Sequence, residues 1–131
     1  MTAGAESVSV VVVDDTDHVR TMLVEMLELD GFSVVGQAGS GEDALALVGS
    51  CDPDVVIMDL KMPGLDGLET TRRLKESRPD QWVILYTAYL DATIEAEARA
   101  AGVTLCLGKI EGLQELEREL SRLTLELTGD G

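Results

Sequence analysis

Three carboxylates follow two apolar runs of this sequence. The first run, Val8–Val13, ends in the adjacent pair Asp14 and Asp15, and the second, Val55–Met58, ends in Asp59, with a proline-glycine turn a few residues further on. If both runs are neighbouring parallel strands, their ends bring the three acids together. Such a cluster repels itself and needs a cation to hold it. The sequence therefore predicts a functional site at this point.

Two further strand-like runs end in residues with chemical uses. Trp82–Tyr86 is followed by Thr87, and Leu105–Leu107 lies just before Lys109. In open parallel sheets, sites form beyond the carboxyl ends of the strands. A hydroxyl and an ammonium would thus join the carboxylates in one pocket, and this joint pattern is more specific than any of its members.

The elements that position these residues alternate along the chain, which favours a parallel sheet with crossover helices. This pattern predicts a doubly wound α/β sheet of five strands with five helices. Thr16 or Asp17 can cap the first helix, Ser40 the second, which is expected to stop at Gly49, and Asp91 the fourth, whose inward face is mostly alanine. The expected strands are 8–13, 32–38, 55–58, 82–87 and 105–107, and the expected helices are 17–29, 41–48, 65–77, 92–101 and 113–127.

The composition agrees with one α/β domain. The chain has 131 residues, of which 45% are hydrophobic and only 3% aromatic, so its core consists of Val, Leu, Ile and Ala, as is usual for parallel sheets covered on both faces. The net charge is -15, from 25 acidic and 10 basic residues. So negative a surface disfavours direct binding to nucleic acid and to anionic membranes.

The cellular location and the limits of the domain are predicted from the cysteines and from the absence of targeting and membrane-spanning segments. Cys51 and Cys106 form no CxxC pair and are interpreted as reduced, packed cysteines. No signal peptide is visible, and no apolar run approaches the ~20 residues of a membrane span. We expect a cytoplasmic domain over residues 8–128, with flexible termini at 1–7 and 129–131.

The last predicted helix carries a leucine stripe with two interpretations. Its leucines alternate at spacings of three and four, as in a heptad seam that would form a homodimer. The alternative, which the shortness of the repeat favours, is that the stripe covers the sheet within one chain. Its members are Leu113, Leu116, Leu120, Leu123 and Leu127.

At these residues the chain resembles the receiver domains of two-component response regulators, over roughly Val8 to Leu127. The matching residues are the Asp14-Asp15 pair, Asp59 with the Leu-Lys-Met-Pro-Gly that follows it, Thr87 with its alanine, and Lys109. The resemblance implies a flavodoxin-like three-layer α/β/α fold with strand order 2-1-3-4-5. It also implies that Asp59 accepts a phosphoryl group from a phosphohistidine on a histidine kinase or phosphotransfer protein.

The same resemblance implies the roles of the remaining site residues. Asp14, Asp15 and Asp59, with the carbonyl oxygen of Lys61, are expected to bind Mg²⁺, a cation that prefers oxygen ligands. Lys109 is expected to pair with a phosphoryl oxygen, and the hydroxyl of Thr87 to donate to another. By analogy, a downstream protein partner would bind the surface formed by residues 91–128.

Three features depart from the family pattern or vary within it. Ile110 follows Lys109 where the family usually has proline, so we predict a trans bond there. Cys106 replaces the usual Tyr or Phe, so coupling of Thr87 to a rotating aromatic ring cannot operate in its usual form. Lys61 and Tyr89 stand at positions that tune loss of the phosphoryl group, and two large side chains there predict slow self-dephosphorylation.

Other functions stay open at this point. A phosphohydrolase with an aspartate nucleophile would generally separate its two first-strand acids by one residue and need more chain for a cap, so we expect no enzyme beyond self-phosphorylation and self-dephosphorylation. A receiver-like adaptor that no longer needs phosphorylation is a second alternative. A third is the receiver part of a longer transcriptional regulator.

Overall fold

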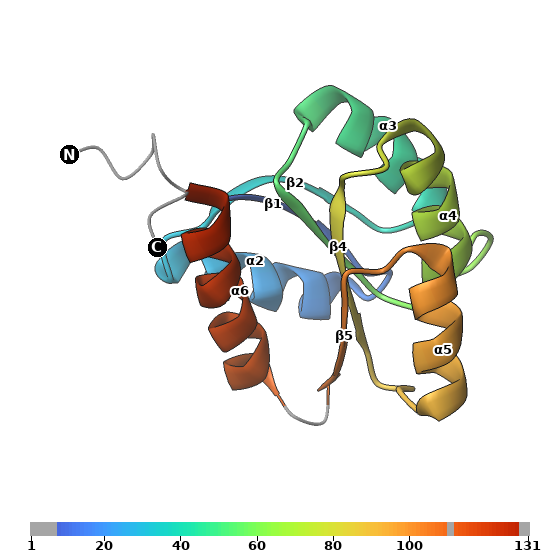
Figure 1. The fold of residues 1–131 in the computed structure, drawn as a ribbon. Helices are drawn as coiled ribbons and strands as arrows, with labels where there is room; N and C mark the ends of the chain where they lie inside the picture. The colour runs from blue at the N-terminus through green and yellow to red at the C-terminus, as the bar shows by residue number, and fades with distance from the viewer. Residues whose placement is uncertain (1–7, 110–111, 129–131) are drawn as a thin grey trace.

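The computed structural model describes residues 8–109 and 112–128, and within them the chain forms one parallel sheet covered by helices on both faces (Figure 1). The strand order is β2-β1-β3-β4-β5, with every neighbouring pair parallel. The predicted fold class and order are confirmed. The strands are β1 (Ser9–Val13), β2 (Ser33–Ala38), β3 (Val55–Met58), β4 (Trp82–Thr87) and β5 (Leu105–Gly108).

The helices divide into two layers. On one face of the sheet lie α2 and α6, and on the other lie α3, α4 and α5 (Figure 1). Right-handed crossovers between parallel strands produce this arrangement when the order of the strands reverses within the sheet. The helices are α2 (Asp17–Leu29), α3 (Gly41–Cys51), α4 (Gly67–Ser77), α5 (Ala92–Ala101) and α6 (Leu113–Thr128).

Burial explains which strands are central. All four residues of β3 are buried, and so are the last four of β1 and the last five of β4. In β2, at the edge of the sheet, exposed residues alternate with partly buried ones up to Ala38, which is buried. A continuous apolar run is typical of a strand covered on both faces, whereas alternation is typical of an edge.

The leucine stripe of α6 belongs to the core. Leu116, Leu120 and Leu123 are buried and pack with Leu23 and Leu27 of α2 and with residues of the central strands. These leucines therefore cover the sheet, as one of the two interpretations predicted, and are not available as a heptad seam for a second chain. The side chain of Leu127 lies outside the described residues.

Three sequence predictions about the helices differ from the structure. Helix α3 continues through Gly49 to Cys51, because Asp52 supplies the left-handed C-cap conformation (φ 51°) that we had expected from the glycine. Helix α4 begins at Gly67, after its cap Asp66, and not at Leu65. On α5, Ala92 is exposed, whereas Ala98 and Ala101 are buried as expected.

Several predictions fall outside the described residues. These are the trans bond between Lys109 and Ile110 and the flexible termini at 1–7 and 129–131. Among the helices that the structure describes, none is long and apolar enough to cross a membrane.

Candidate functional site

The register of the central strands aligns their carboxyl ends. Val13 of β1 pairs with Met58 of β3, so Asp14 and Asp59 follow directly at the same edge of the sheet. The amide of Asp59 donates to the carbonyl of Val13 at 2.9 Å, which carries the ladder one residue beyond the strands. The convergence of acids expected from the sequence is therefore present in the structure.

Asp14, Asp15 and Asp59 form a compact carboxylate cluster. Each offers one carboxylate oxygen, and these three oxygens lie within 4.8 Å of one another. Asp14 and Asp59 are buried, with 2% and 8% exposure, whereas Asp15 is exposed. Two acids thus form the floor of the site, and the third lies at its rim in contact with solvent.

The donor set fits the family's cation. Carboxylate oxygens are hard ligands suited to Mg²⁺, which binds them at about 2.1 Å, so ligands on opposite sides of the ion stand about 4.2 Å apart. Ligands at adjacent positions around such an ion stand about 3 Å apart, so the three oxygens, which lie within 4.8 Å of one another, would draw closer together around the ion. An open rim at Asp15 suits a cation that usually keeps several waters.

Lys109 supplies the positive charge of the cluster. Its Nζ donates to Asp14 Oδ2 at 3.0 Å and lies 3.6 Å from Asp59 Oδ1. Nζ also lies 5.7 Å from the ring centroid of Tyr86, within range of a cation–π contact. Burial favours the neutral amine, but the bond to Asp14 and the charges of Asp59 and Asp14 outweigh it and raise the pKa of Lys109. Lys109 therefore stays protonated at neutral pH.

The pKa of Asp59 is raised from 3.8 to about 6, mainly by burial and then by the charge of Asp14, with a smaller contribution from Asp15. Lys109 and the amide of Leu60, which donates to Asp59 Oδ1 at 2.9 Å, act in the opposite direction. At pH 7 the carboxylate is still mostly ionised, although burial and the neighbouring charge of Asp14 destabilise its charged form. A bound cation would offset this destabilisation.

Thr87 and Tyr89 form the adjoining wall. Thr87 ends β4 opposite Gly108 of β5, and it is completely buried. Its Oγ1 accepts from the amide of Tyr89 at 3.1 Å, and a hydroxyl in that role keeps its own hydrogen for donation. The ring of Tyr89 is exposed and lies under the ammonium of Lys61, with 5.3 Å between Nζ and the ring centroid. Lys61 and Tyr89 follow Asp59 and Thr87 by two residues each, and the carbonyl of Lys61 stays a predicted ligand.

The loop after Asp59 is fixed by a close backbone approach. Gly67, the first residue of α4, donates its amide to the carbonyl of Leu60 at 2.8 Å. A Cβ at Gly67 would lie 2.2 Å from the carbonyl oxygen of Asp59, a distance that no side chain can occupy. Only glycine allows α4 to begin against the back of the acceptor residue.

Two contacts of the site were missed by sequence reasoning. Arg20 reaches the carbonyl of Asp14, and Tyr86 lies beside Lys109. Neither contact leaves a periodicity or turn signal in the sequence, because one is with a backbone atom and the other depends on the packing of two strands.

Cys106, which stands where the family has an aromatic ring, is half-buried. Burial comes first among the causes that raise the pKa of its thiol.

Comparisons with known proteins agree with this geometry. The response regulator receiver domain matches residues 10–121. The response regulator GacA of Pseudomonas aeruginosa is 42% identical over 117 residues, which cover 88% of this chain and 55% of GacA. UvrY of Escherichia coli is 37% identical over 110 residues, covering 83% of this chain and 50% of UvrY. The chain spans about half the length of the curated relatives it matches.

Solved structures show the same fold. A LuxR-family response regulator from Aurantimonas sp. SI85-9A1 superposes with a TM-score of 0.87 at 26% identity, covering 92% of this chain and 86% of that one. The receiver domain of the response regulator NarL from Mycobacterium tuberculosis gives a TM-score of 0.80 at 29% identity, covering 95% and 98%. With the sheet order, the acidic cluster and these matches together, the chain belongs to the receiver domain family of response regulators.

Proposed function

We propose that this chain, as a receiver unit over residues 8–128, accepts a phosphoryl group on Asp59 from a histidine kinase or phosphotransfer protein and thereby switches a partner-binding surface. The observation that carries this proposal is the convergence of Asp14, Asp15 and Asp59 with Lys109 at one edge of the sheet. Receiver domains of response regulators interact with histidine kinases and bind Mg²⁺ at an acidic pocket, which agrees with this use of the cluster.

The transfer itself requires little from the protein beyond placement and charge. A carboxylate oxygen of Asp59 attacks phosphorus, the P–N bond to the donor imidazole breaks, and the nitrogen keeps the electron pair and takes up a proton. The product is an acyl phosphate on Asp59. No general base is needed because Asp59 is mostly ionised at pH 7, with a pKa of about 6.

Charge around the transferring group is the main obstacle, and the chain has groups to offset it. Asp14, Asp15, Asp59 and the carbonyl of Lys61 would hold Mg²⁺, which when bound neutralises charge on the phosphoryl oxygens. Lys109 would leave Asp59, 3.6 Å away, for a phosphoryl oxygen. The amide of Leu60, already directed at Asp59 Oδ1, would donate to the acyl phosphate.

The switch would begin at Thr87. The added phosphoryl group brings about one further negative charge and three acceptor oxygens. The hydroxyl of Thr87 would turn to donate to one of them, and its bond from the amide of Tyr89 would break. That amide belongs to the loop that leads into α5, so the change would pass to the surface of residues 91–128, where a downstream protein would bind. Cys106 stands in place of the usual aromatic ring, and the aromatic side chains nearest to Thr87 in sequence are Tyr86 and Tyr89.

The test is intact-mass measurement after incubation with acetyl phosphate and Mg²⁺. Wild type should gain one phosphoryl group, Asp59→Asn should gain none, and Asp80→Asn, an exposed acid before β4, should match wild type. The adduct should disappear at alkaline pH, as an acyl phosphate does. A wild type that gains no mass would favour a receiver-like adaptor that works without phosphorylation. An Asp59→Asn variant that gains as much as wild type would refute the acceptor assignment.

A second candidate concerns the protein of which the receiver is a part. Because the curated relatives are about twice as long as the match, we propose as an alternative that the domain serves as the receiver of a longer transcriptional regulator. With a net charge of -15, the receiver itself would not bind DNA directly. Phosphorylation-dependent DNA binding by a longer form, absent in the isolated chain, would support this alternative.

A further inference from the structure

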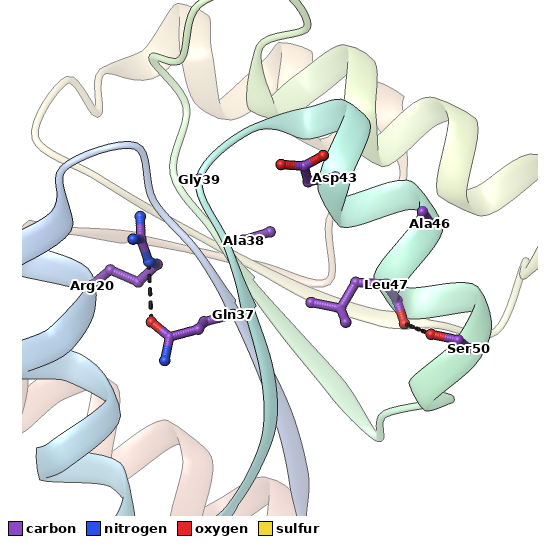
Figure 2. Close-up of a pocket in the computed structure, with 8 residues that line it drawn as sticks. All are labelled: Arg20, Gln37, Ala38, Gly39, Asp43, Ala46, Leu47 and Ser50. Atoms are coloured by element: carbon purple, nitrogen blue, oxygen red, sulfur yellow. Dashed lines mark hydrogen bonds between the residues drawn. The ribbon is translucent and has the colours of Figure 1, made fainter.

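Arg20, on α2 behind the acidic cluster, uses its guanidinium to join three segments of the chain. Nη1 donates to the carbonyl oxygen of Asp14 at 2.6 Å, Nε donates to Gln37 Oε1 on β2 at 3.1 Å, and Nη2 donates to Asp17 Oδ1 at 2.7 Å. The side chain is 17% exposed although it is charged. Figure 2 shows Arg20 directed toward Gln37, with Gly39 nearby.

The bond to Asp14 matters because of the peptide group that it fixes. The carbonyl of Asp14 belongs to the peptide that joins Asp14 to Asp15, and the orientation of that plane sets where the second carboxylate leaves the backbone relative to the first. Asp14 is held at every polar atom: its amide donates to Ala38, and its carboxylate accepts from Thr16 and Lys109. Asp15 is exposed, so the peptide plane is its main constraint.

The surroundings of Arg20 are shaped for this contact. A Cβ on Gly39 would lie 3.2 Å from Nη1 of Arg20, so the glycine leaves room for the guanidinium to reach the Asp14 carbonyl. Gln37 accepts a hydrogen bond from Nε of the same guanidinium, which fixes a second edge of this planar group. The ion pair with Asp17 is a weaker reason for the arrangement, because Asp17 is 88% exposed and such pairs contribute little.

We propose that Arg20 is a positioning residue for the cation site, fixing the peptide between the two acids so that Asp15 meets the ion in a set orientation. This inference rests on the proposed function, since it assigns Arg20 a part in binding Mg²⁺ by the same acids. Residues that orient metal ligands typically change metal affinity about 10- to 100-fold when removed. The expected effect of losing the guanidinium is therefore at least tenfold weaker Mg²⁺ binding.

The experiment compares Arg20→Lys and Gln37→Ala with two controls, Asp17→Asn and Arg73→Lys. Lysine keeps the charge but is a point donor that cannot hold two fixed acceptors as a planar fork does. Arg73 on α4 is an exposed arginine that pairs with Glu69, so its exchange for lysine tests for a general effect. Arg20 and Gln37 line an open groove of about 500 Å³, so the smaller side chains are accommodated without overpacking.

Two measurements are made on each folded variant. The first is the backbone amide resonance of Asp15 without Mg²⁺, which reports hydrogen bonding at the carbonyl of its own peptide group. The second is Mg²⁺ affinity by calorimetry. Arg20→Lys should shift the Asp15 resonance and weaken Mg²⁺ at least tenfold, Gln37→Ala should do both to a smaller extent, and the two controls should match wild type. Phosphorylation by acetyl phosphate should recover in Arg20→Lys when Mg²⁺ is raised to saturation.

Each failure has its own pattern. If wild type binds Mg²⁺ and gains phosphate but Arg20→Lys has wild-type affinity and an unmoved Asp15 resonance, the positioning role is overturned and the proposed function stands. If Asp17→Asn weakens Mg²⁺ as much as Arg20→Lys, the surface ion pair is responsible and the role is overturned as well. If wild type neither binds Mg²⁺ nor gains phosphate, the proposed function fails first, and this inference fails with it.

Discussion

Replacing Asp59 by asparagine should stabilise the fold at pH 7 when Mg²⁺ is removed with a chelator. The folded protein holds the pKa of Asp59 at about 6, against 3.8 for an ordinary aspartate, because the group is buried beside Asp14. Between these pH values the folded state binds more protons than the unfolded state, so the free energy of unfolding falls as pH rises from about 4 to about 6. Asparagine has no such titration, and its stability lacks this fall.

The magnitude follows from the two pKa values. At about 1.4 kcal/mol per pH unit, the difference corresponds to about 3 kcal/mol for complete ionisation. Water at the open rim and relaxation of the loop reduce this value, so we expect a gain of about 1–2 kcal/mol in Asp59→Asn. Lys109 is not left unpaired by the change, because its hydrogen bond to Asp14 at 3.0 Å remains.

The assay is urea unfolding at pH 4 and pH 7, in chelator and in Mg²⁺, with Asp80→Asn as the matched control. In chelator, Asp59→Asn and wild type should differ little at pH 4, and the variant should be more stable at pH 7. In Mg²⁺ the difference in free energy of unfolding between the variant and wild type should shrink or change sign. A ligand at 100 times its Kd stabilises the native state by about 2.7 kcal/mol, and the variant is expected to bind Mg²⁺ more weakly.

Two results would refute this reasoning. If Asp59→Asn is less stable than wild type at pH 7 in chelator, the charge of Asp59 is compensated in the fold and the pKa argument is wrong. If Mg²⁺ stabilises wild type and Asp59→Asn equally, the ion binds elsewhere. A gain of the same size in Asp80→Asn would point to the net charge of -15 as the cause.

Three further changes have expected outcomes. Gly67→Ala should lower the free energy of unfolding by more than about 1 kcal/mol in urea melts, because the new methyl group would clash with the carbonyl of Asp59. The control is Gly49→Ala on α3, where the methyl group meets no other atom, so its effect on stability should be neutral or favourable. Lys109→Met should slow phosphorylation by acetyl phosphate while Mg²⁺ affinity by calorimetry is kept or increased, since it removes a cation that competes for Asp14; equal loss of both would contradict this role. Tyr89→Ala should speed loss of the phosphoryl group several-fold, measured by intact mass over time, because the exposed ring, which lies under Lys61, is expected to shield the acyl phosphate from water. An unchanged lifetime would show that the ring does not shield it.

The fold was largely predictable because strand burial leaves a direct trace in the sequence. The β-branched run ending at Asp14 and the apolar Val55–Met58 predicted two central strands, and the parallel register then placed their acids together. Helix ends were predicted less accurately. Gly49 is a common stop signal, but the left-handed conformation is adopted by Asp52, three residues later and directly after Cys51.

The contacts behind the site could not be read in the same way. Arg20 binds the carbonyl of Asp14, and every residue type presents a carbonyl, so the sequence gives no indication of the partner. The pairing of Lys61 with the ring of Tyr89 likewise depends on two loops that meet only in the folded chain. Sequence patterns predict where side chains emerge from the sheet, whereas side-chain contacts with backbone atoms depend on the folded geometry.

Helices α4 and α5, which follow the strands that carry Asp59 and Thr87, differ greatly in the apolar surface that they bury. In α5, described along its whole length, the buried side chains are the methyl groups of Ala98 and Ala101, with Ile94 partly buried, whereas α4 buries Leu68, Leu74 and two threonines. Burial stabilises by only about 0.8 kcal/mol per methylene, so the small apolar surface that α5 buries gives this helix a low free energy of local unfolding. In hydrogen–deuterium exchange, its amides should label well before those of α4. An easily opened segment that follows Thr87 would let a modest chemical event remodel one flank of the domain while the sheet beneath stays intact.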